Sequence, residues 1–145
     1  MATVRDILAR KGTQVFTIGK HASVLDAALL MNEHRIGSAV VLDDGRVIGM
    51  FTERDVLQRV VADQRDPART LVAEVMTTEV ACCTIDTDLA EARGAMKNRR
   101  IRHLPVVDGD QKLLGMVSIG DLNAFEASDA EHTIHLLQEY LYGRV

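Results

Sequence analysis

The chain has 145 residues, of which 17 are basic and 21 acidic, so its formal net charge is −4 at pH 7. This length, together with 47% hydrophobic residues, indicates a globular chain rather than a disordered or fibrous one. The acidic balance argues against broad binding to nucleic-acid backbones, and the 3% of aromatic residues argues against a platform for stacking single-stranded bases. No apolar run is long enough to span a bilayer, so we expect neither a nucleic acid nor a membrane as partner.

The N-terminus and the cysteines predict where the protein works. The first twelve residues include Asp6 and lack an uninterrupted apolar core, so they do not have the pattern of a secretory signal. The two cysteines, Cys82 and Cys83, are neighbours, and adjacent cysteines rarely form a disulfide because their side chains diverge. Both observations predict a reduced, cytoplasmic setting.

The first half of the chain predicts a strand, a helix, two further strands and a second helix. Ser23, with Asp26 three residues later, has the side chains of a capping box at the start of the first helix. An Asp-Asp-Gly sequence between the last two strands has the composition of a tight turn. The expected strands are Gln14–Ile18, Ser38–Leu42 and Val47–Phe51, and the second helix begins at Thr52.

The second half predicts the same order of elements after a link at residues 63–70. Pro67 in this link cannot extend the helix that precedes it. Asp88, with Glu91 three residues later, again has the side chains of a capping box. The expected strands are Glu79–Cys83, Leu104–Val107 and Leu113–Val117, and the second helix begins at Ser118.

The two halves are copies of one another. A shift of 65 residues lays Val15–Asp43 over Val80–Asp108 with matching apolar phase, and one inserted residue near Asp110 then changes the shift to 66. The chain is therefore a tandem repeat of about 60 residues, each copy reading β-α-β-β-α. The identical pairs include Val15/Val80, Ala27/Ala92, Met31/Met96, Arg35/Arg100, Ile36/Ile101, Val41/Val106, Gly49/Gly115 and Asp55/Asp121.

Past the second copy, a further capping box at Ser128 predicts a last helix that ends near Tyr142. Ile134, Leu137 and Leu141 form one apolar stripe on this helix, which must cover the chain's own core or a partner. We therefore expect three parts. They are residues 1–66, the first unit with its lead-in and the start of the linker; residues 67–127, the second unit; and residues 128–145, a terminal amphipathic helix.

Two short motifs carry a family resemblance. Gly49–Asp55 (GMFTERD) and Gly115–Asp121 (GMVSIGD) resemble the G-h-h-S/T-x-x-D signature of cystathionine-β-synthase (CBS) domains. Further segments resemble the lead-in and second-strand regions of that family: Val4–Leu8 with Val72–Met76, and His34–Val41 with Arg100–Val107. Because the whole set occurs twice in order, the chain resembles a stand-alone CBS pair with no catalytic domain attached.

The resemblance implies an α+β fold in which two CBS units pack with pseudo-two-fold symmetry and leave two clefts. Clefts of this family bind adenosine-containing ligands such as AMP, ADP, ATP, NAD or S-adenosylmethionine, and the family is mainly regulatory. We therefore expect a sensor that signals to a client protein and associates as a homodimer. We expect it to be no enzyme, to need no cofactor beyond the regulatory nucleotide, and to hold no metal.

Two aspartates are the sharpest candidates for ligand contact. The carboxylates of Asp55 and Asp121 each offer two acceptor oxygens to the adjacent hydroxyls of a ribose. Thr52 and Ser118, three residues earlier, stand at expected helix starts, where free amides favour phosphate or hydroxyl oxygens. The same spacing is also that of a plain helix cap, and the two roles are compatible.

The resemblance, carried over crosswise between the units, implies two sets of ligand-binding residues. Cleft one would take Phe16, Thr17, Ile36, Gly37, Ser38, Ser118, Gly120 and Asp121. Cleft two would take Ala81, Cys82, Ile101, Arg102, His103, Thr52, Arg54 and Asp55.

A local basic cluster lies in the second copy, at Arg99, Arg100, Arg102 and His103. It suits a phosphate clamp because guanidinium groups match phosphate oxygens, and it also suits a solvated helix end, where cations are favoured. The first copy has Gly and Ser at the positions of Arg102 and His103, so we expect the clefts to differ in affinity or ligand.

Other functions stay open as alternatives. The chain could be a ligand-independent interaction scaffold that works through its terminal helix, or an enzyme that uses a bound nucleotide. It could be redox-active if Arg102 lowered the pKa of a cysteine thiol. His132 and His135 share a helix face, but a metal site needs further donors that the sequence does not indicate. No nucleophile elbow, HExxH, P-loop or GxGxxG motif supports catalysis.

Overall fold

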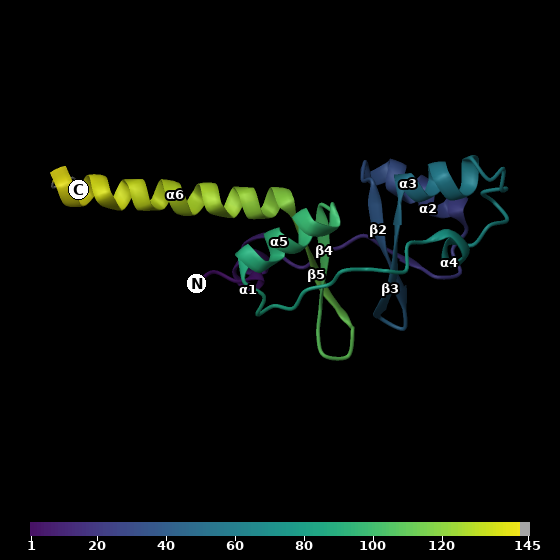
Figure 1. The fold of residues 1–145 in the computed structure, drawn as a ribbon, viewed down its shortest axis with the longest axis horizontal. Coiled ribbons are helices and arrows are strands. Elements are labelled where there is room, and N and C mark those ends of the chain that lie inside the picture. The colour runs from purple at the N-terminus through teal and green to yellow at the C-terminus, as the bar shows by residue number, and fades with distance from the viewer. Residues whose placement is uncertain (143–145) are drawn as a thin grey trace.

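The computed structural model describes residues 1–142, apart from the side chains of residues 132, 135, 136, 139, 140 and 142. Two lobes of strands and helices lie along the long axis of the molecule, and helix α6 (Ile119–Tyr142) extends away from one of them (Figure 1). Each lobe contains one copy of the repeated β-hairpin, preceded and followed in sequence by a helix. The predicted α+β pair is confirmed.

The first lobe holds a three-stranded sheet in the order β1-β2-β3. The first two strands are parallel and the last two antiparallel, because a helix separates the former and a tight turn joins the latter. The elements of this lobe are β1 (Thr17–Gly19), α2 (Val24–His34), β2 (Ser38–Asp43), β3 (Arg46–Thr52), α3 (Glu53–Asp55) and the π-helix η1 (Val56–Val61).

The second lobe has two strands instead of three. The predicted strand Glu79–Cys83 is wrong, because within the described chain only Cys83 of this segment pairs, as a parallel bridge to Val106. Thr77 still pairs with Met50 of the first lobe, so the residues that follow Thr77 have to cross to the second lobe before they reach β4. The elements of this lobe are α5 (Leu89–Arg99), β4 (His103–Val107), β5 (Leu113–Ser118) and the start of α6.

Each hydrophobic core is completed by a lead-in helix from the other copy. Helix α1 (Val4–Lys11) buries its apolar side chains in the core of the second lobe, around Leu104. Helix α4 (Val72–Val75) does the same in the first lobe, around Phe51. A cut at the expected unit boundary, between residues 66 and 67, would therefore leave each core without one of its helices and expose the apolar surface it covers.

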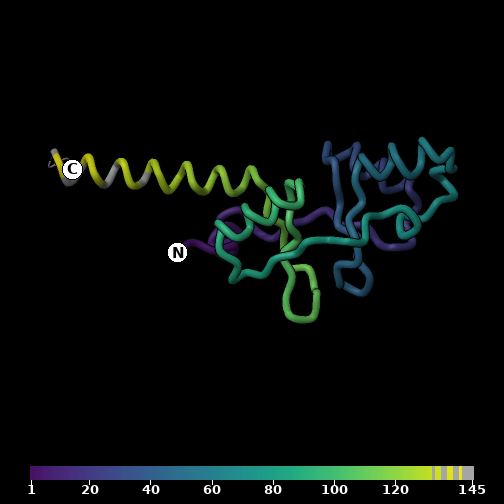
Figure 2. Tube along the Cα trace, viewed as in Figure 1, coloured from purple at the N-terminus to yellow at the C-terminus, as the bar shows by residue number. Residues whose placement is uncertain are grey.

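The two hairpins meet at their tips (Figure 2). The Val47 amide donates to the Gln111 carbonyl at 3.0 Å, and the Leu113 amide donates to the Gly45 carbonyl at 3.1 Å. These backbone hydrogen bonds connect the lobes a second time, through residues that are distant in sequence from the lead-in helices α1 and α4.

Three of the predicted helix caps are confirmed. The side chains of Ser23, Thr52 and Ser118 each accept a hydrogen bond from the amide three residues later, at 3.0, 3.2 and 3.1 Å. Asp88 precedes α5, but its side chain accepts no capping hydrogen bond from the described residues. The helix start predicted at Ser128 is wrong, because α6 runs unbroken through this point and residues 121–142 contain neither Pro nor Gly to interrupt it.

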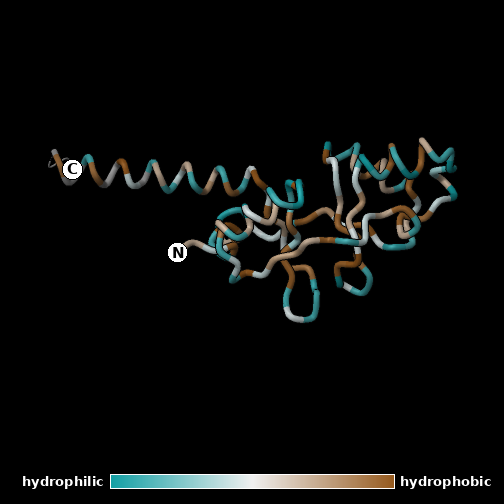
Figure 3. Tube along the Cα trace, viewed as in Figure 1, coloured by the Kyte–Doolittle hydropathy of each residue, from teal (hydrophilic) through white to brown (hydrophobic). Residues whose placement is uncertain are grey.

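Hydrophobic and hydrophilic residues alternate along the outer part of α6 (Figure 3). Ile134, Leu137 and Leu141 are 56%, 55% and 67% exposed. Of the two surfaces that this stripe is expected to cover, the chain's own core or a partner, it does not cover the core within the described chain. No helix among residues 1–142 combines the length and the apolarity that crossing a bilayer requires. The last three residues of the expected part 128–145 lie outside the described residues.

Candidate functional site

Two cavities lie where the lobes face each other. Cleft one has a volume of about 350 Å³ and cleft two of about 850 Å³, both within the range of small-molecule sites. Each is lined by residues of both lobes, and Gly37, Ser38 and His103 line both cavities. The arrangement therefore places two neighbouring sites, with part of their walls in common, at the junction of the two copies.

Cleft two brings together most of the residues predicted for it. The seven that line it are Ala81, Ile101, Arg102, His103, Thr52, Arg54 and Asp55. Cys82 is absent from the described residues that line this cavity. The sequence did not point to several other lining residues, which include Glu53, Gln58, Arg59, Thr77, Glu79 and Val80.

The carboxylate of Asp55 is held at the start of α3. Its Oδ2 accepts hydrogen bonds from the amide of Thr52 at 3.0 Å and from the hydroxyl of Thr52 at 3.1 Å. The amide of Asp55 in turn donates to Thr52 Oγ1. Asp55 therefore caps α3 and lines cleft two at the same time. Both roles are possible because the β3–α3 junction, which needs the cap, also forms part of the cavity wall.

Two residues from elsewhere in the chain complete the surroundings of Asp55. Thr77, beyond α4, donates its hydroxyl to Oδ1 at 3.0 Å and to Oδ2 at 3.3 Å. Arg59 of η1 places Nε 3.8 Å from Oδ1 and donates from Nη1 to the carbonyls of Val75 and Met76. Asp55 is 4% exposed. Its carboxylate is therefore held by Thr52 of its own motif and by Thr77, which follows the lead-in helix of the second copy.

Cleft two is rich in positive charge. Five arginines line it against three carboxylates, and an excess of guanidinium groups favours a ligand with phosphate or other anionic groups. Burial lowers the pKa of the His103 imidazole, although the nearby Asp121 carboxylate partly offsets this effect. The arginines are Arg54, Arg59, Arg99, Arg100 and Arg102, and the carboxylates are Glu53, Asp55 and Glu79.

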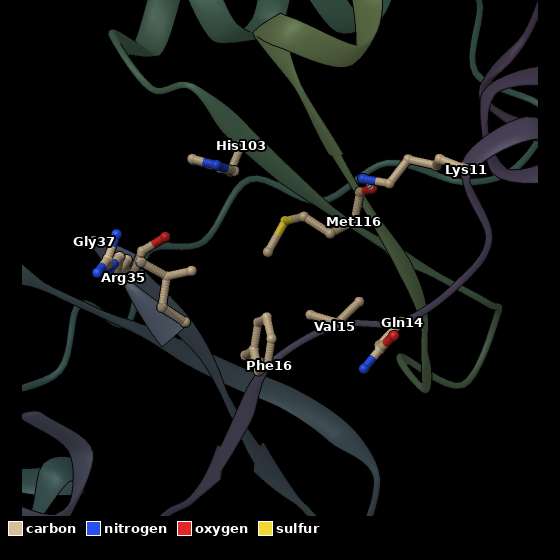
Figure 4. A pocket seen from close by; sticks show the side chains of 10 residues that line it. Lys11, Gln14, Val15, Phe16, Arg35, Gly37, His103 and Met116 are labelled. Carbon is tan, nitrogen blue, oxygen red and sulfur yellow. Dashed lines mark hydrogen bonds between the residues drawn. The ribbon is translucent and has the colours of Figure 1, made fainter. Parts of the chain in front are cut away.

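Cleft one brings together only half of its predicted residues. Phe16, Ile36, Gly37 and Ser38 line it. Among the described residues that line this cavity, Thr17, Ser118, Gly120 and Asp121 do not appear. Figure 4 shows Lys11 and Arg35 at opposite sides of the cavity, with Phe16 between them in the view. The Phe16 ring stacks on the imidazole of His34 with 4.2 Å between the ring centroids.

Asp121, the counterpart of Asp55, is paired with a lysine from α1. Lys11 Nζ donates to Asp121 Oδ2 at 2.7 Å and to the Met116 carbonyl at 2.9 Å. The Ser118 amide donates to the same Oδ2 at 2.8 Å. Partial burial acts to raise the pKa of the Asp121 carboxyl, but the hydrogen bonds from Lys11 and Ser118 and the charge of Lys11 outweigh it, and the pKa is lowered.

The cysteines lack the electrostatic surroundings of reactive thiols. Burial raises the pKa of the Cys82 thiol, and burial together with the neighbouring Cys82 raises the pKa of Cys83 to about 11. The hypothesis that Arg102 lowers a cysteine pKa is therefore wrong, since reactive thiols need a lowered pKa.

Metal-ligating side chains are scattered. Among the described side chains, no group of three or more His, Cys, Asp or Glu lies close enough to hold a metal ion. The side chains of His132 and His135 lie outside the described residues.

A sequence signal for Lys11 does exist. The shift between the copies is 68 in the lead-ins, where Val4 matches Val72, but 65 from Val15 onward. The three additional residues of the first copy correspond to the longer lead-in helix, eight residues in α1 against four in α4, and Lys11 is the last residue of that helix. The mismatch in shift indicates an additional helical turn in the first copy, but it does not indicate which residue Lys11 contacts.

The comparisons with known proteins agree with this architecture. The sequence model of the CBS domain matches residues 3–62 and 72–128. The chain is 36% identical over 129 residues to the CBS domain-containing protein YhcV of Bacillus subtilis, which covers 89% of each chain. It is similar to a solved protein with CBS domains from Burkholderia ambifaria, with 39% identity, a TM-score of 0.79, and coverage of 88% of this chain and 96% of that one.

A more distant structure has the same fold. It is a CBS domain protein of Pyrobaculum aerophilum complexed with AMP, with 24% identity, a TM-score of 0.71, and coverage of 83% of this chain and 89% of that one. Two matches of the family model, which together span most of the chain, coincide with the two copies of the repeat. The chain belongs to the CBS domain family and contains a tandem pair of these domains.

Proposed function

We propose that this protein is a regulatory module that binds an adenosine-containing ligand, with cleft two as its main site. The observation that carries the proposal is the composition of cleft two, in which Asp55 of one lobe faces a cavity lined by arginines of both lobes. The complex of the Pyrobaculum aerophilum relative with AMP supports this class of ligand. In this proposal the protein works by binding, in the cytoplasm, rather than by catalysis.

The residues of cleft two have complementary tasks in this proposal. Asp55 accepts from a ribose hydroxyl, because a carboxylate has about four lone-pair positions and the protons donated by the Thr52 amide, the Thr52 hydroxyl and the Thr77 hydroxyl leave about one of them, on Oδ1. Arg54 and Arg102 hold phosphate oxygens. Adenine packs on the apolar segments of the cavity, which come from residues 80–81 and 101.

Ligand binding would change the arrangement of the lobes by population shift. Cleft two is lined by both lobes, so a ligand that contacts both binds best to the arrangement in which they are closed around it. A client protein that recognises this arrangement would then respond to the ligand concentration.

An exposed apolar surface on the first lobe supports the proposal of a homodimer. Leu25 and Leu29 of α2, and Leu57 and Val61 of η1, are exposed large apolar residues. The corresponding residues of the second copy are small or polar: Ala90, Gly94, Asn123 and Ala127. We expect Leu29→Glu with Leu57→Glu to convert a dimer into a monomer in light scattering, whereas a mass unchanged by the substitutions would contradict this interface.

Thermal unfolding with separate additions of AMP, ATP, NAD and S-adenosylmethionine tests the proposed function. A ligand at about one hundred times its Kd stabilises the folded state by about 2.7 kcal/mol, which raises the Tm by several degrees. Asp55→Asn should remove the shift relative to its own ligand-free Tm, whereas the exposed control Asp63→Asn should keep it. No shift with any of the four, or a full shift in Asp55→Asn, would contradict the proposal.

The protruding part of α6 favours a second candidate, a ligand-independent interaction scaffold. Its exposed stripe of Ile134, Leu137 and Leu141 could bind an amphipathic partner surface. Under this alternative, Ile134→Glu with Leu137→Glu abolishes the regulatory effect in cells while the nucleotide-induced Tm shift is unchanged. A regulatory effect that survives these substitutions and is lost in Asp55→Asn favours the ligand sensor instead.

A further inference from the structure

We propose that Lys11 is an internal counter-ion that occupies the ribose-binding carboxylate of cleft one, so that the unmodified chain takes one nucleoside ligand, in cleft two. The inference rests on the proposed function, in which the motif aspartate of a cleft accepts from a ribose hydroxyl. Lys11 would then determine which of the two clefts can bind the ligand.

The contacts of Lys11 place its ammonium between cleft one and Asp121. Nζ donates to Asp121 Oδ2 and to the Met116 carbonyl at 2.7 and 2.9 Å. Lys11 and Met116 line the cavity, whereas Asp121 is absent from the described residues that line it. A ribose in cleft one would therefore meet the ammonium before it reached the carboxylate.

The two copies supply hydrogen bonds to the same two groups, a strand carbonyl and the motif carboxylate, in different ways. In the first lobe, the amide of Thr77 donates to the Met50 carbonyl at 2.8 Å and its hydroxyl donates to Asp55. In the second lobe, the single ammonium of Lys11 donates both to the carbonyl of Met116, the counterpart of Met50, and to Asp121. In the second lobe, the charged ammonium of Lys11 thus takes the place of the neutral hydroxyl and amide that Thr77 supplies in the first.

This replacement follows from the length of the lead-in helices. Helix α1 has eight residues and α4 has four, and the additional turn of α1 carries Lys11 to β5. The shorter α4 is followed instead by Thr77, whose backbone pairs with β3. The asymmetry between the clefts is therefore built into the sequence of the lead-ins.

Because of the charge of Lys11, we expect Asp55 and Asp121 to differ in how strongly they bind ribose hydroxyls. Asp55 takes its hydrogen bonds from neutral groups, because the nearby cation, Arg59, keeps its Nε 3.8 Å from Oδ1 and donates to the carbonyls of Val75 and Met76 instead. Since no cation among the described residues is hydrogen-bonded to Asp55, its carboxylate keeps more of its strength as an acceptor for ribose hydroxyls.

A hydrogen bond between two charged groups is stronger than one between neutral groups, and ribose would have to displace the Lys11 ammonium to reach Oδ2 of Asp121. We expect Lys11→Met to tighten binding in cleft one by about fivefold to tenfold, because the ligand then displaces neither the partly exposed ion pair with Asp121 nor the hydrogen bond to the Met116 carbonyl.

Isothermal titration calorimetry with AMP tests the inference on the full chain. The unmodified protein should bind one AMP per chain, and Lys11→Met and Lys11→Gln should each bind two. Lys11→Arg keeps the charge and should bind one. Lys97→Met removes an exposed lysine of α5 that lies outside both cavities, and it should also bind one. Asp121→Asn, added to Lys11→Met, should return the number of bound AMP molecules from two to one.

Each outcome has one interpretation. Two AMP molecules per unmodified chain, or one per chain with and without Lys11, would overturn the inference and leave the proposed function intact. Weaker binding after Lys11→Met would also overturn it, because Lys11 would then be a ligand contact. If neither the unmodified chain nor the two Lys11 variants bind AMP, the proposed function fails and the inference fails with it.

Discussion

The hydroxyl of Thr77 donates to both carboxylate oxygens of Asp55, at 3.0 and 3.3 Å. Thr77 follows the lead-in helix of the second copy, whereas Asp55 belongs to the motif of the first, so this contact ties the candidate site to the exchange of lead-in helices between the lobes. A carboxylate that is 4% exposed depends on such partners, because a buried charged group without hydrogen bonds is costly.

Thr77→Val should lower the free energy of unfolding by about 1–3 kcal/mol, because Asp55 loses a donor while it stays buried. Urea unfolding followed by circular dichroism measures the change. The neighbouring control Thr78→Val alters an exposed side chain and should change the stability by less than about 0.5 kcal/mol. Equal stabilities of the two variants would show that the hydroxyl of Thr77 is not needed.

Gly49→Ala should destabilise the first lobe, because the two residues that follow α4 approach β3 too closely for a methyl group. An added Cβ at Gly49 would lie 2.6 Å from Met76 Sδ and 2.9 Å from the backbone carbonyl of Thr77. Overpacking of this kind costs about 1–3 kcal/mol. Gly115→Ala should cost less, since the added Cβ meets only the flexible end of Leu8, at 2.9 Å.

A matched control for these substitutions is Gly94→Ala in α5. An added Cβ at this position has nothing within 4 Å, and Ala is a better helix former than Gly, so we expect a gain of about 0.5–1 kcal/mol. Urea unfolding of all three variants gives the order. If Gly49→Ala is as stable as Gly94→Ala, the close approach of the segment after α4 to β3 is wrong.

The Lys11–Asp121 pair should make the stability depend on pH at the acidic end. Its hydrogen bonds lower the pKa of Asp121 in the folded state below the ordinary value of 3.8. The contribution of the pair is therefore fully present above that ordinary value and is lost as the pH falls through the lowered, folded-state pKa. With side chains 33% and 23% exposed, the pair contributes about 1 kcal/mol at most.

Unfolding of the unmodified chain and of Lys11→Met in urea, between pH 7 and pH 3, checks this dependence. The stability difference between the two should be constant from pH 7 to pH 5 and should shrink below the ordinary pKa of the carboxyl. Lys97→Met serves as the control and should follow the unmodified chain at every pH. A difference that persists undiminished at pH 3 would mean that Lys11 acts through packing rather than through Asp121.

The cysteines should react slowly in the folded protein. A thiol with a pKa of about 11, such as Cys83, is ionised to roughly one part in a thousand at pH 8, and the thiolate is the nucleophile. Mass spectrometry after iodoacetamide treatment should show slow alkylation of native protein, slower at Cys83 than at Cys82, and fast alkylation of both in urea. Equal rates in native and urea-unfolded protein would return a redox role to consideration.

Much of cleft two could be predicted from the sequence because its residues lie in short local motifs that resemble those of CBS domains, and the resemblance implied that the two sets share a cleft. Thr52 and Asp55 belong to a capping box whose spacing is visible in the chain, and Arg102 and His103 lead directly into a strand that the apolar pattern marks. Arg59 was not found because its role depends on η1 and on its contact with the end of α4. Thr77 was missed for the same reason, since no pattern in the sequence joins it to Asp55 across 22 residues.

The sequence by itself determined the tandem repeat, the order of its elements, the turns and most of the caps, because these depend on residues a few positions apart. Only the tertiary structure decided which lead-in helix completes which core, and that Lys11 rather than a solvent-filled space faces Asp121. The physical reason is the range of the interaction. Lys11 and Asp121 are 110 positions apart, and their contact exists only because α1 packs on the strands of the other copy, whose register and burial no local pattern specifies.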